Sequence, residues 1–221
     1  MSTFIHFGLC KTGTSFLQHE IFPKIPNINF LYAKNQGDIL RFREKPHCIN
    51  LISHEELSGK PYVTKNTDDI RFIVADRMKA MFPTAKALIG IRELDPWLRS
   101  CYKQSIIGGN DKSYSDWCNT INRDYWNIKA YLLHIKKLFP EGYVYTMHDF
   151  ITDNERIIQE ICSFLGTEVP PHKQKLVNRS LTDGQVKVLR FINHFLRSDN
   201  YNPNRKISQY PLSLIIRKLK R

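Results

Sequence analysis

The sequence predicts an α/β fold in three layers, with a central, mainly parallel β-sheet flanked by helices. Short apolar runs typical of buried strands alternate with segments of helical periodicity, and strands separated in this way form parallel sheets. A chain of 221 residues is long enough for one such domain and short for two. We therefore expect a single domain over residues 1–221.

The expected elements alternate along the chain. We expect strands at residues 3–7, 48–53, 86–91 and 143–147, and helices at 14–22, 68–82, 95–107, 121–138, 153–165 and 183–197. In helix 68–82, one apolar face is formed by Ile70, Ile73, Val74, Met78 and Met81. Ligands of parallel α/β sheets bind at the carboxyl ends of the strands, and each motif described below falls at such an end.

Composition and charge exclude several classes of protein. No run approaches the ~20 apolar residues of a membrane span, and no signal-like segment precedes the first strand, which predicts a cytoplasmic protein. Five scattered cysteines without a C-x-x-C pair predict reduced structural thiols and no metal site. The net charge of +12 indicates an anionic partner. Residues 206–221 form a basic amphipathic segment suited either to peripheral contact with an anionic membrane or to packing on the domain as a helix.

The stretch GLCKTGTS, from Gly8 to Ser15, lies between the first strand and the first helix. A glycine-rich turn in this position directs backbone N–H groups at an anion. In a nucleotide-hydrolysing P-loop the lysine follows the last glycine, whereas here Lys11 precedes Gly13 and Thr14 follows it. This P-loop-like arrangement therefore suits a shorter anion than a triphosphate, although the stretch also fits a plain polar turn that caps a helix.

A second anion motif ends the 86–91 strand. Arg92 follows the strand and Ser100 comes eight residues later on the next helix, so guanidinium and hydroxyl are able to grip one phosphate. A capped surface helix with Arg92 paired to Glu93 or Asp95 is the alternative.

With this second motif, the sequence resembles the sulfotransferase family, which uses 3′-phosphoadenosine-5′-phosphosulfate (PAPS) as donor. The family's loop has the form P-K-[ST]-G-[ST]-[ST], and this chain departs from it by having Cys10 in place of proline. The resemblance implies that the 5′-phosphosulfate is held by Lys11, Thr12, Gly13, Thr14 and Ser15, with Lys11 near the bridging oxygen. It also implies that Arg92 and Ser100 bind the 3′-phosphate, and that no metal is required.

The end of the 48–53 strand offers the candidate base. His54, Glu55 and Glu56 follow its apolar run. Similarity to glycan-type sulfotransferases, which place a catalytic glutamate there, favours Glu55, whereas similarity to small-molecule sulfotransferases favours His54. For Glu56 we favour an ordinary position in the first turn of a helix.

The acceptor is the least determined part of the interpretation. The resemblance implies a saccharide or glycoconjugate, with a small molecule as the alternative. A groove for it could be lined by residues 62–66, Arg71, Lys103, Trp117 and Arg123, which could equally be solvated or core residues. The competing classes are a nucleotide kinase or other NTPase, a basic nucleic-acid-binding module, which lacks any recognised signature here, and a non-catalytic sulfotransferase fold.

Overall fold

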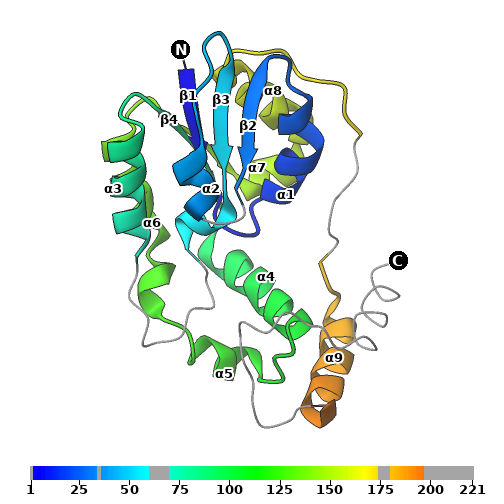
Figure 1. The fold of residues 1–221 in the computed structure, drawn as a ribbon. Helices are drawn as coiled ribbons and strands as arrows, with labels where there is room; N and C mark the ends of the chain where they lie inside the picture. The colour runs from blue at the N-terminus through cyan, green and yellow to red at the C-terminus, as the bar shows by residue number, and fades with distance from the viewer. Residues whose placement is uncertain (1, 34–35, 60–69, 174–179, 197–221) are drawn as a thin grey trace.

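The computed structural model describes residues 2–33, 36–59, 70–173 and 180–196 (Figure 1). The expected acceptor segment 62–66 and the basic segment 206–221 lie outside these residues, so the roles expected of them stay predictions.

Five parallel strands form the central sheet, in the order β2-β3-β1-β4-β5. Their bounds are β1 Ser2–His6, β2 Ile28–Tyr32, β3 Ile49–Ser53, β4 Lys86–Ile91 and β5 Tyr143–Thr146. Four of the five strands were expected, and the predicted α/β class with a parallel sheet flanked by helices is confirmed.

The fifth strand, β2, was missed because its apolar run is interrupted, and it forms one of the two edges of the sheet. It pairs only with β3 among the described strands, and its residues are half-buried or exposed. Asn29 therefore interrupts its apolar run, and Asn29 Nδ2 donates to Arg43 O and Asn50 Oδ1, each at 2.8 Å. A half-buried strand needs no continuous apolar stretch, and without one β2 lacked the signal that located the other four strands, the second edge strand β5 included.

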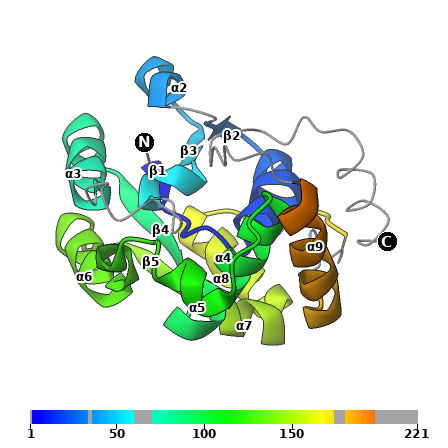
Figure 2. The ribbon, with the colours of Figure 1, turned by 90° about the horizontal axis from the view of Figure 1, so that it is seen from below.

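Helices cover both faces of the sheet and the end to which the strands point. Their bounds are α1 Thr14–Phe16, α2 Gln36–Arg41, α3 Arg71–Met81, α4 Leu94–Ile107, α5 Tyr114–Cys118, α6 Ile128–Leu138, α7 Met147–Thr152, α8 Asn154–Leu165 and α9 Asp183–Leu196. One face packs against α1, α7 and α8, and the other against α2, α3 and α6 (Figure 2). A third apolar cluster joins α4, α5 and α9 beyond the carboxyl ends of the strands.

Two expected helices are divided in the structure. The 14–22 segment is α1 followed by a π-helix, Leu17–Ile21, and a 3₁₀ turn, Phe22–Lys24. The 121–138 segment is a 3₁₀ turn, Arg123–Trp126, and α6, because the Asn127 side chain accepts from the N–H of Ala130 and so starts a new helix. None of the described helices is both long and apolar enough to span a bilayer.

The expected apolar face of α3 is only partly buried, since Met78 and Val74 pack in the core but its other members do not. Ile70, Ile73 and Met81 are exposed, and the buried residues of α3 include Arg71 and Met78. The shift follows from Arg71, whose guanidinium is fully buried.

Aromatic rings and carbonyl oxygens surround that guanidinium. Its carbon lies 4.6 Å from the Tyr125 ring centroid and 5.0 Å from that of Tyr131. The guanidinium also donates to Asp124 O at 3.0 Å and to Tyr125 O at 3.2 Å. Cation–π contacts and these hydrogen bonds replace the water that Arg71 loses on burial, so the helix turns its arginine inward.

A row of polar side chains crosses the carboxyl ends of the strands beneath α1. The Nδ1 atom of His6 lies 2.8 Å from Ser53 Oγ, and its Nε2 atom lies 3.2 Å from Tyr145 Oη. Gln18, from the π-helix, donates to the same Ser53 Oγ at 2.8 Å. The Ser53 hydroxyl can then donate to Nδ1, which leaves the Nε2 proton for Tyr145. Burial lowers the pKa of His6 to about 3, so the imidazole is neutral.

This burial predicts a pH-dependent stability. The unfolded chain binds a proton at His6 below pH ~6.5 and the folded chain does not, so the contribution is complete above ~6.5 and is lost as the pH falls toward 3. Between pH 7 and 5.5 we expect His6 to account for a loss of about 1.2 kcal/mol in the free energy of unfolding.

Urea denaturation of the protein and of His6→Gln at both pH values measures this difference. The variant should show a flatter pH dependence than the unmodified protein. The control His19→Gln changes an exposed histidine in the π-helix Leu17–Ile21. It should retain the pH dependence of the unmodified protein. If the free energy of unfolding changes equally with pH in the unmodified protein and in His6→Gln, then His6 is not protected from protonation.

Candidate functional site

The loop Gly8–Gly13 continues β1 and is held beside β4. The N–H of Phe7 donates to Leu88 O at 2.8 Å, and the N–H of Leu9 donates to Gly90 O at 3.4 Å. Beyond Leu9 the backbone turns, with Lys11 at φ 68° and Gly13 at φ 83°. A β-carbon added at Gly8 would lie 2.1 Å from Thr14 Cγ2, so only glycine fits at the start of this turn.

The floor of the loop is closely packed. Thr12 is fully buried, and its Oγ1 donates to Leu9 O at 2.6 Å, which closes the turn on itself. A β-carbon at Gly90 would lie 2.5 Å from the Tyr145 ring and 2.8 Å from Thr12 Oγ1. Glycine in β4 therefore lets the loop and the ring of Tyr145 approach the sheet together.

The rim of the loop carries donors for an anion. Within the described part of the chain, the backbone N–H groups of Thr12, Gly13 and Thr14 have no hydrogen-bond acceptor. Successive N–H groups of this kind in a turn with left-handed residues form an anion-binding concavity.

Helix α4 holds the loop at two points, and the residue Arg92 that precedes the helix adds a third. Trp97 Nε1 donates to Cys10 O at 2.9 Å, and Lys11 Nζ donates to Gln104 Oε1 at 3.4 Å. Just before α4, Arg92 Nη1 donates to Lys11 O at 3.2 Å. The two anion motifs of the sequence, 81 residues apart at Lys11 and Arg92, are therefore in direct contact.

Arg92 and Ser100 retain capacity to bind an anion. Burial lowers the pKa of the half-buried Arg92 guanidinium, which nevertheless stays charged because its ordinary value is far above neutrality. Only one of its nitrogens is used by the loop. The hydroxyl of Ser100, on α4, has no hydrogen-bond partner among the described residues.

The candidate base lies at the end of β3. His54 follows the strand and its side chain is 5% exposed. Glu55 and Glu56 open the 3₁₀ helix Glu55–Ser58, so Glu55 is attached to the same carboxyl edge as the loop. The side chains of Glu55 and Glu56 lie outside what the structure describes.

Most of the residues expected in an acceptor groove have structural roles. Arg71 is fully buried in its aromatic cage, and Trp117 is buried in the third apolar cluster. Lys103 Nζ donates to Leu181 O at 2.8 Å and pairs with Asp183 at 3.0 Å, which fastens α4 to α9. Arg123 is exposed in its 3₁₀ turn. Among the described members of the expected groove, Arg71, Lys103 and Trp117 are thus engaged in structural contacts.

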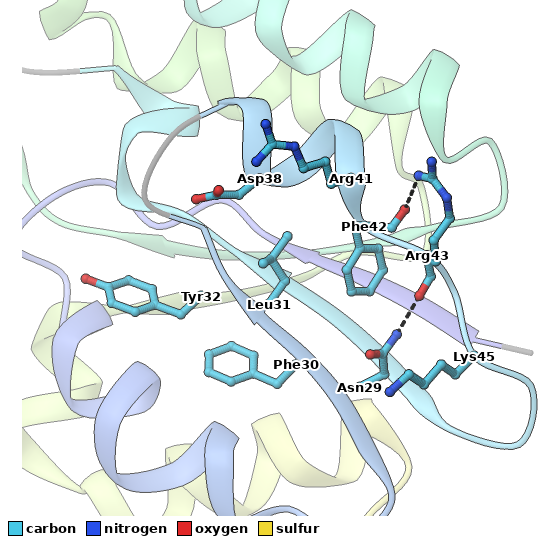
Figure 3. A pocket seen from close by; sticks show the side chains of 9 residues that line it. All are labelled: Asn29, Phe30, Leu31, Tyr32, Asp38, Arg41, Phe42, Arg43 and Lys45. Carbon is cyan, nitrogen blue, oxygen red and sulfur yellow. Dashed lines mark hydrogen bonds between the residues drawn. The ribbon is translucent and has the colours of Figure 1, made fainter.

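A pocket of about 600 Å³ lies instead along the open edge of β2 (Figure 3). Its lining residues are Asn29, Phe30, Leu31, Tyr32, Asp38, Arg41, Phe42, Arg43 and Lys45. Aromatic and aliphatic side chains of β2 form its floor, with α2 above. Three cationic side chains and one carboxylate line it, so the pocket carries an excess of positive charge.

Sequence reasoning missed the residues of α4 that hold the loop. The helix that follows Arg92 carries Trp97, Cys101 and Gln104. Counted from Trp97, these residues are spaced i, i+4 and i+7 and therefore lie on one face of the helix. That spacing was available in the sequence. The sequence did not show, however, that this face of the helix would contact residues 10 and 11.

Comparisons with known proteins agree with the geometry at the level of the fold. No protein-family model matches the chain, and no curated protein sequence matches it. A sulfotransferase from Alicyclobacillus acidocaldarius has a similar crystal structure, with a TM-score of 0.51 and 17% identity over 80% of this chain and 87% of that one.

Two further sulfotransferase structures show weaker similarity. Mouse sulfotransferase SULT7A1, solved with PAP, gives a TM-score of 0.47 and 12% identity over 88% of this chain and 64% of that one. The sulfotransferase domain from the curacin biosynthetic pathway gives 0.44 and 11% over 84% and 81%. The five-stranded parallel sheet, the loop after β1 and the similarity to the Alicyclobacillus structure together show that this chain has the sulfotransferase fold.

Proposed function

We propose that the protein is a sulfotransferase that transfers a sulfuryl group from PAPS to a hydroxyl or amine of an acidic saccharide. The contact between Arg92 Nη1 and Lys11 O carries the proposal, because it joins two anion-binding motifs into one site at the carboxyl edge of the sheet. The shared fold supports it.

The loop and the start of α4 would divide the donor between them. In this proposal the N–H groups of the loop and the Lys11 ammonium hold the 5′-phosphosulfate, as charge-assisted hydrogen bonds favour. The remaining N–H groups of Arg92 and the Ser100 hydroxyl hold the 3′-phosphate. Two separate anionic groups match this division, whereas the single triphosphate of ATP does not.

Transfer requires in-line geometry, a base and stabilisation of the leaving oxygen. The acceptor oxygen attacks sulfur while the bond from sulfur to the 5′-phosphate oxygen breaks. Glu55 takes the acceptor proton, and Lys11 stabilises the charge left on the product, 3′-phosphoadenosine-5′-phosphate (PAP). We prefer Glu55 to His54 as base because the His54 side chain is buried.

The pocket along β2 is the proposed anchor of the acceptor. Tyr32 is the Cα partner of Ser53, which is in turn the partner of His6, so Tyr32 lies two strand spacings, ~10 Å, from the end of β1. Its ring is 41% exposed and offers a surface on which a sugar can stack. The side chains of Arg41 and Lys45 have no ion-pair or hydrogen-bond partner among the described residues. Such cations suit the carboxylates or sulfates of an acidic saccharide.

We expect the protein to bind PAP, and Lys11→Ala to weaken that binding roughly 10- to 100-fold because it removes a charge-assisted hydrogen bond. Isothermal titration with PAP measures the Kd. The control Lys129→Ala removes the same charge from an exposed position on α6 and should bind PAP normally. Thermal stabilisation that is larger with ATP and Mg²⁺ than with PAP would favour an NTPase instead.

Incubation with sulfur-labelled PAPS and a panel of acidic glycans, neutral glycans and phenols tests the reaction itself. Acidic glycans should take up label. Glu55→Gln should reduce this transfer roughly 10²- to 10⁴-fold, as loss of a general base does, while the Kd for PAP stays unchanged.

Glu56→Gln is the matched control for Glu55 and should retain most of the transfer. Near-normal transfer by Glu55→Gln would remove Glu55 from the mechanism. Loss of transfer in His54→Asn, with Glu55→Gln active, would assign the base to His54.

For the double variant Arg41→Ala/Lys45→Ala, we expect KM for the labelled acidic glycan to rise by roughly tenfold or more, since two cations that meet the acceptor are lost. The Kd for PAP should not change. Arg77→Ala/Lys129→Ala makes the same charge change on α3 and α6 and serves as the control. An unchanged KM in the first variant would place the acceptor elsewhere.

A further inference from the structure

Two cysteines meet where the loop contacts α4. Cys10 precedes Lys11 in the loop, and Cys101 follows Ser100 on α4. Their Sγ atoms lie 3.8 Å apart, although the residues are separated by 91 positions in the sequence. Both are free thiols in the structure.

The contact is fixed by the packing around it. Trp97 lies one helical turn before Cys101, and its indole N–H holds the carbonyl oxygen of Cys10. Gln104 follows on the same face and holds the Lys11 ammonium. The carbonyl group of Cys10 and the side chain of the next residue are thus both held by α4, which keeps the two sulfurs close together.

The two thiols differ in their surroundings. Cys10 is half-buried, whereas Cys101 is fully buried and burial raises the pKa of its thiol. The cations of Lys11 and Arg92 act on this site in the opposite direction but do not outweigh burial. An oxidant from solvent therefore reaches Cys10 first, and Cys101 is placed to resolve the oxidised form.

We propose that Cys10 and Cys101 form a reversible disulfide that controls donor binding. Hydrogen peroxide oxidises the Cys10 thiol to sulfenic acid and is reduced to water. The Cys101 sulfur then attacks the Cys10 sulfur, the S–S bond forms, and the sulfenic oxygen leaves as a second water with the Cys101 proton. In total the two thiols lose two hydrogens and one peroxide gives two waters; a dithiol reverses the change.

The effect on the donor rests on the proposed function. A disulfide shortens the distance between the two sulfurs from 3.8 Å to about 2 Å. Cys10 and Cys101 move toward each other, and each is the chain neighbour of a donor-binding residue, Lys11 or Ser100. A binding site tolerates displacements of only ~0.5 Å before its geometry is lost. The oxidised protein therefore binds PAP at least tenfold more weakly than the reduced protein.

Peptide mapping under non-reducing conditions, after treatment of the full chain with hydrogen peroxide, tests the disulfide. We expect one cross-linked peptide pair containing Cys10 and Cys101, which disappears with dithiothreitol and is absent from Cys10→Ser and Cys101→Ala. Cys48→Ser changes a half-buried cysteine outside the site and should form the cross-link normally. Absence of the pair, or a Cys10 that stops at sulfinic acid, would overturn the proposal.

Titration with PAP before and after peroxide, and again after dithiothreitol, tests the consequence. Affinity should fall and recover in the unmodified protein and in Cys48→Ser, and should not respond to peroxide in Cys10→Ser, which has no thiol at the oxidised position. A cross-linked protein with unchanged PAP affinity would overturn the control of donor binding. If the reduced protein does not bind PAP at all, the proposed sulfotransferase function fails, and the peptide map still decides whether the disulfide forms.

Discussion

The candidate site depends on the attachment of the loop to α4. Two carbonyl oxygens of the loop, those of Cys10 and Lys11, accept hydrogen bonds from Trp97 and Arg92. These bonds face the loop's carbonyl groups toward α4, while the N–H groups of Thr12 to Thr14 have no protein acceptor in the described structure. The same interaction places the guanidinium of Arg92 beside the loop, so one set of contacts shapes the cradle and supplies its second cation.

The sheet supports this arrangement from below. His6 and Ser53 end β1 and β3, and Tyr145 lies one residue before the end of β5; each hydrogen-bonds its neighbour in the row. Gly90 leaves the space that the Tyr145 ring and the loop occupy. The hydrogen bonds among these three side chains stiffen the layer beneath the loop, and rigidity there is what an anion cradle made of backbone N–H groups requires.

The sequence predicted the fold where burial leaves a periodic pattern. Strands β1, β3 and β4 lie inside the sheet, and their apolar runs located them within one or two residues. The pattern failed for the edge strand β2, and for α3, where Arg71 replaces an apolar residue because aromatic rings and carbonyl oxygens surround it. The hydropathy of a side chain reflects the free-energy cost of removing it from water. It carries no information about the contacts in the folded protein that offset this cost.

What the sequence determined by itself is local. The order of Lys11 and Gly13 after a strand, and the separation of Arg92 and Ser100, are properties of single strand–loop–helix segments, and they pointed to an anion site at the carboxyl edge. Only the tertiary structure decided which groups meet there. Cys10 faces Cys101, and His6 reaches Tyr145 across 139 positions, because strand order and helix packing bring those elements together. A pattern within one element cannot record which residue of another element will face it.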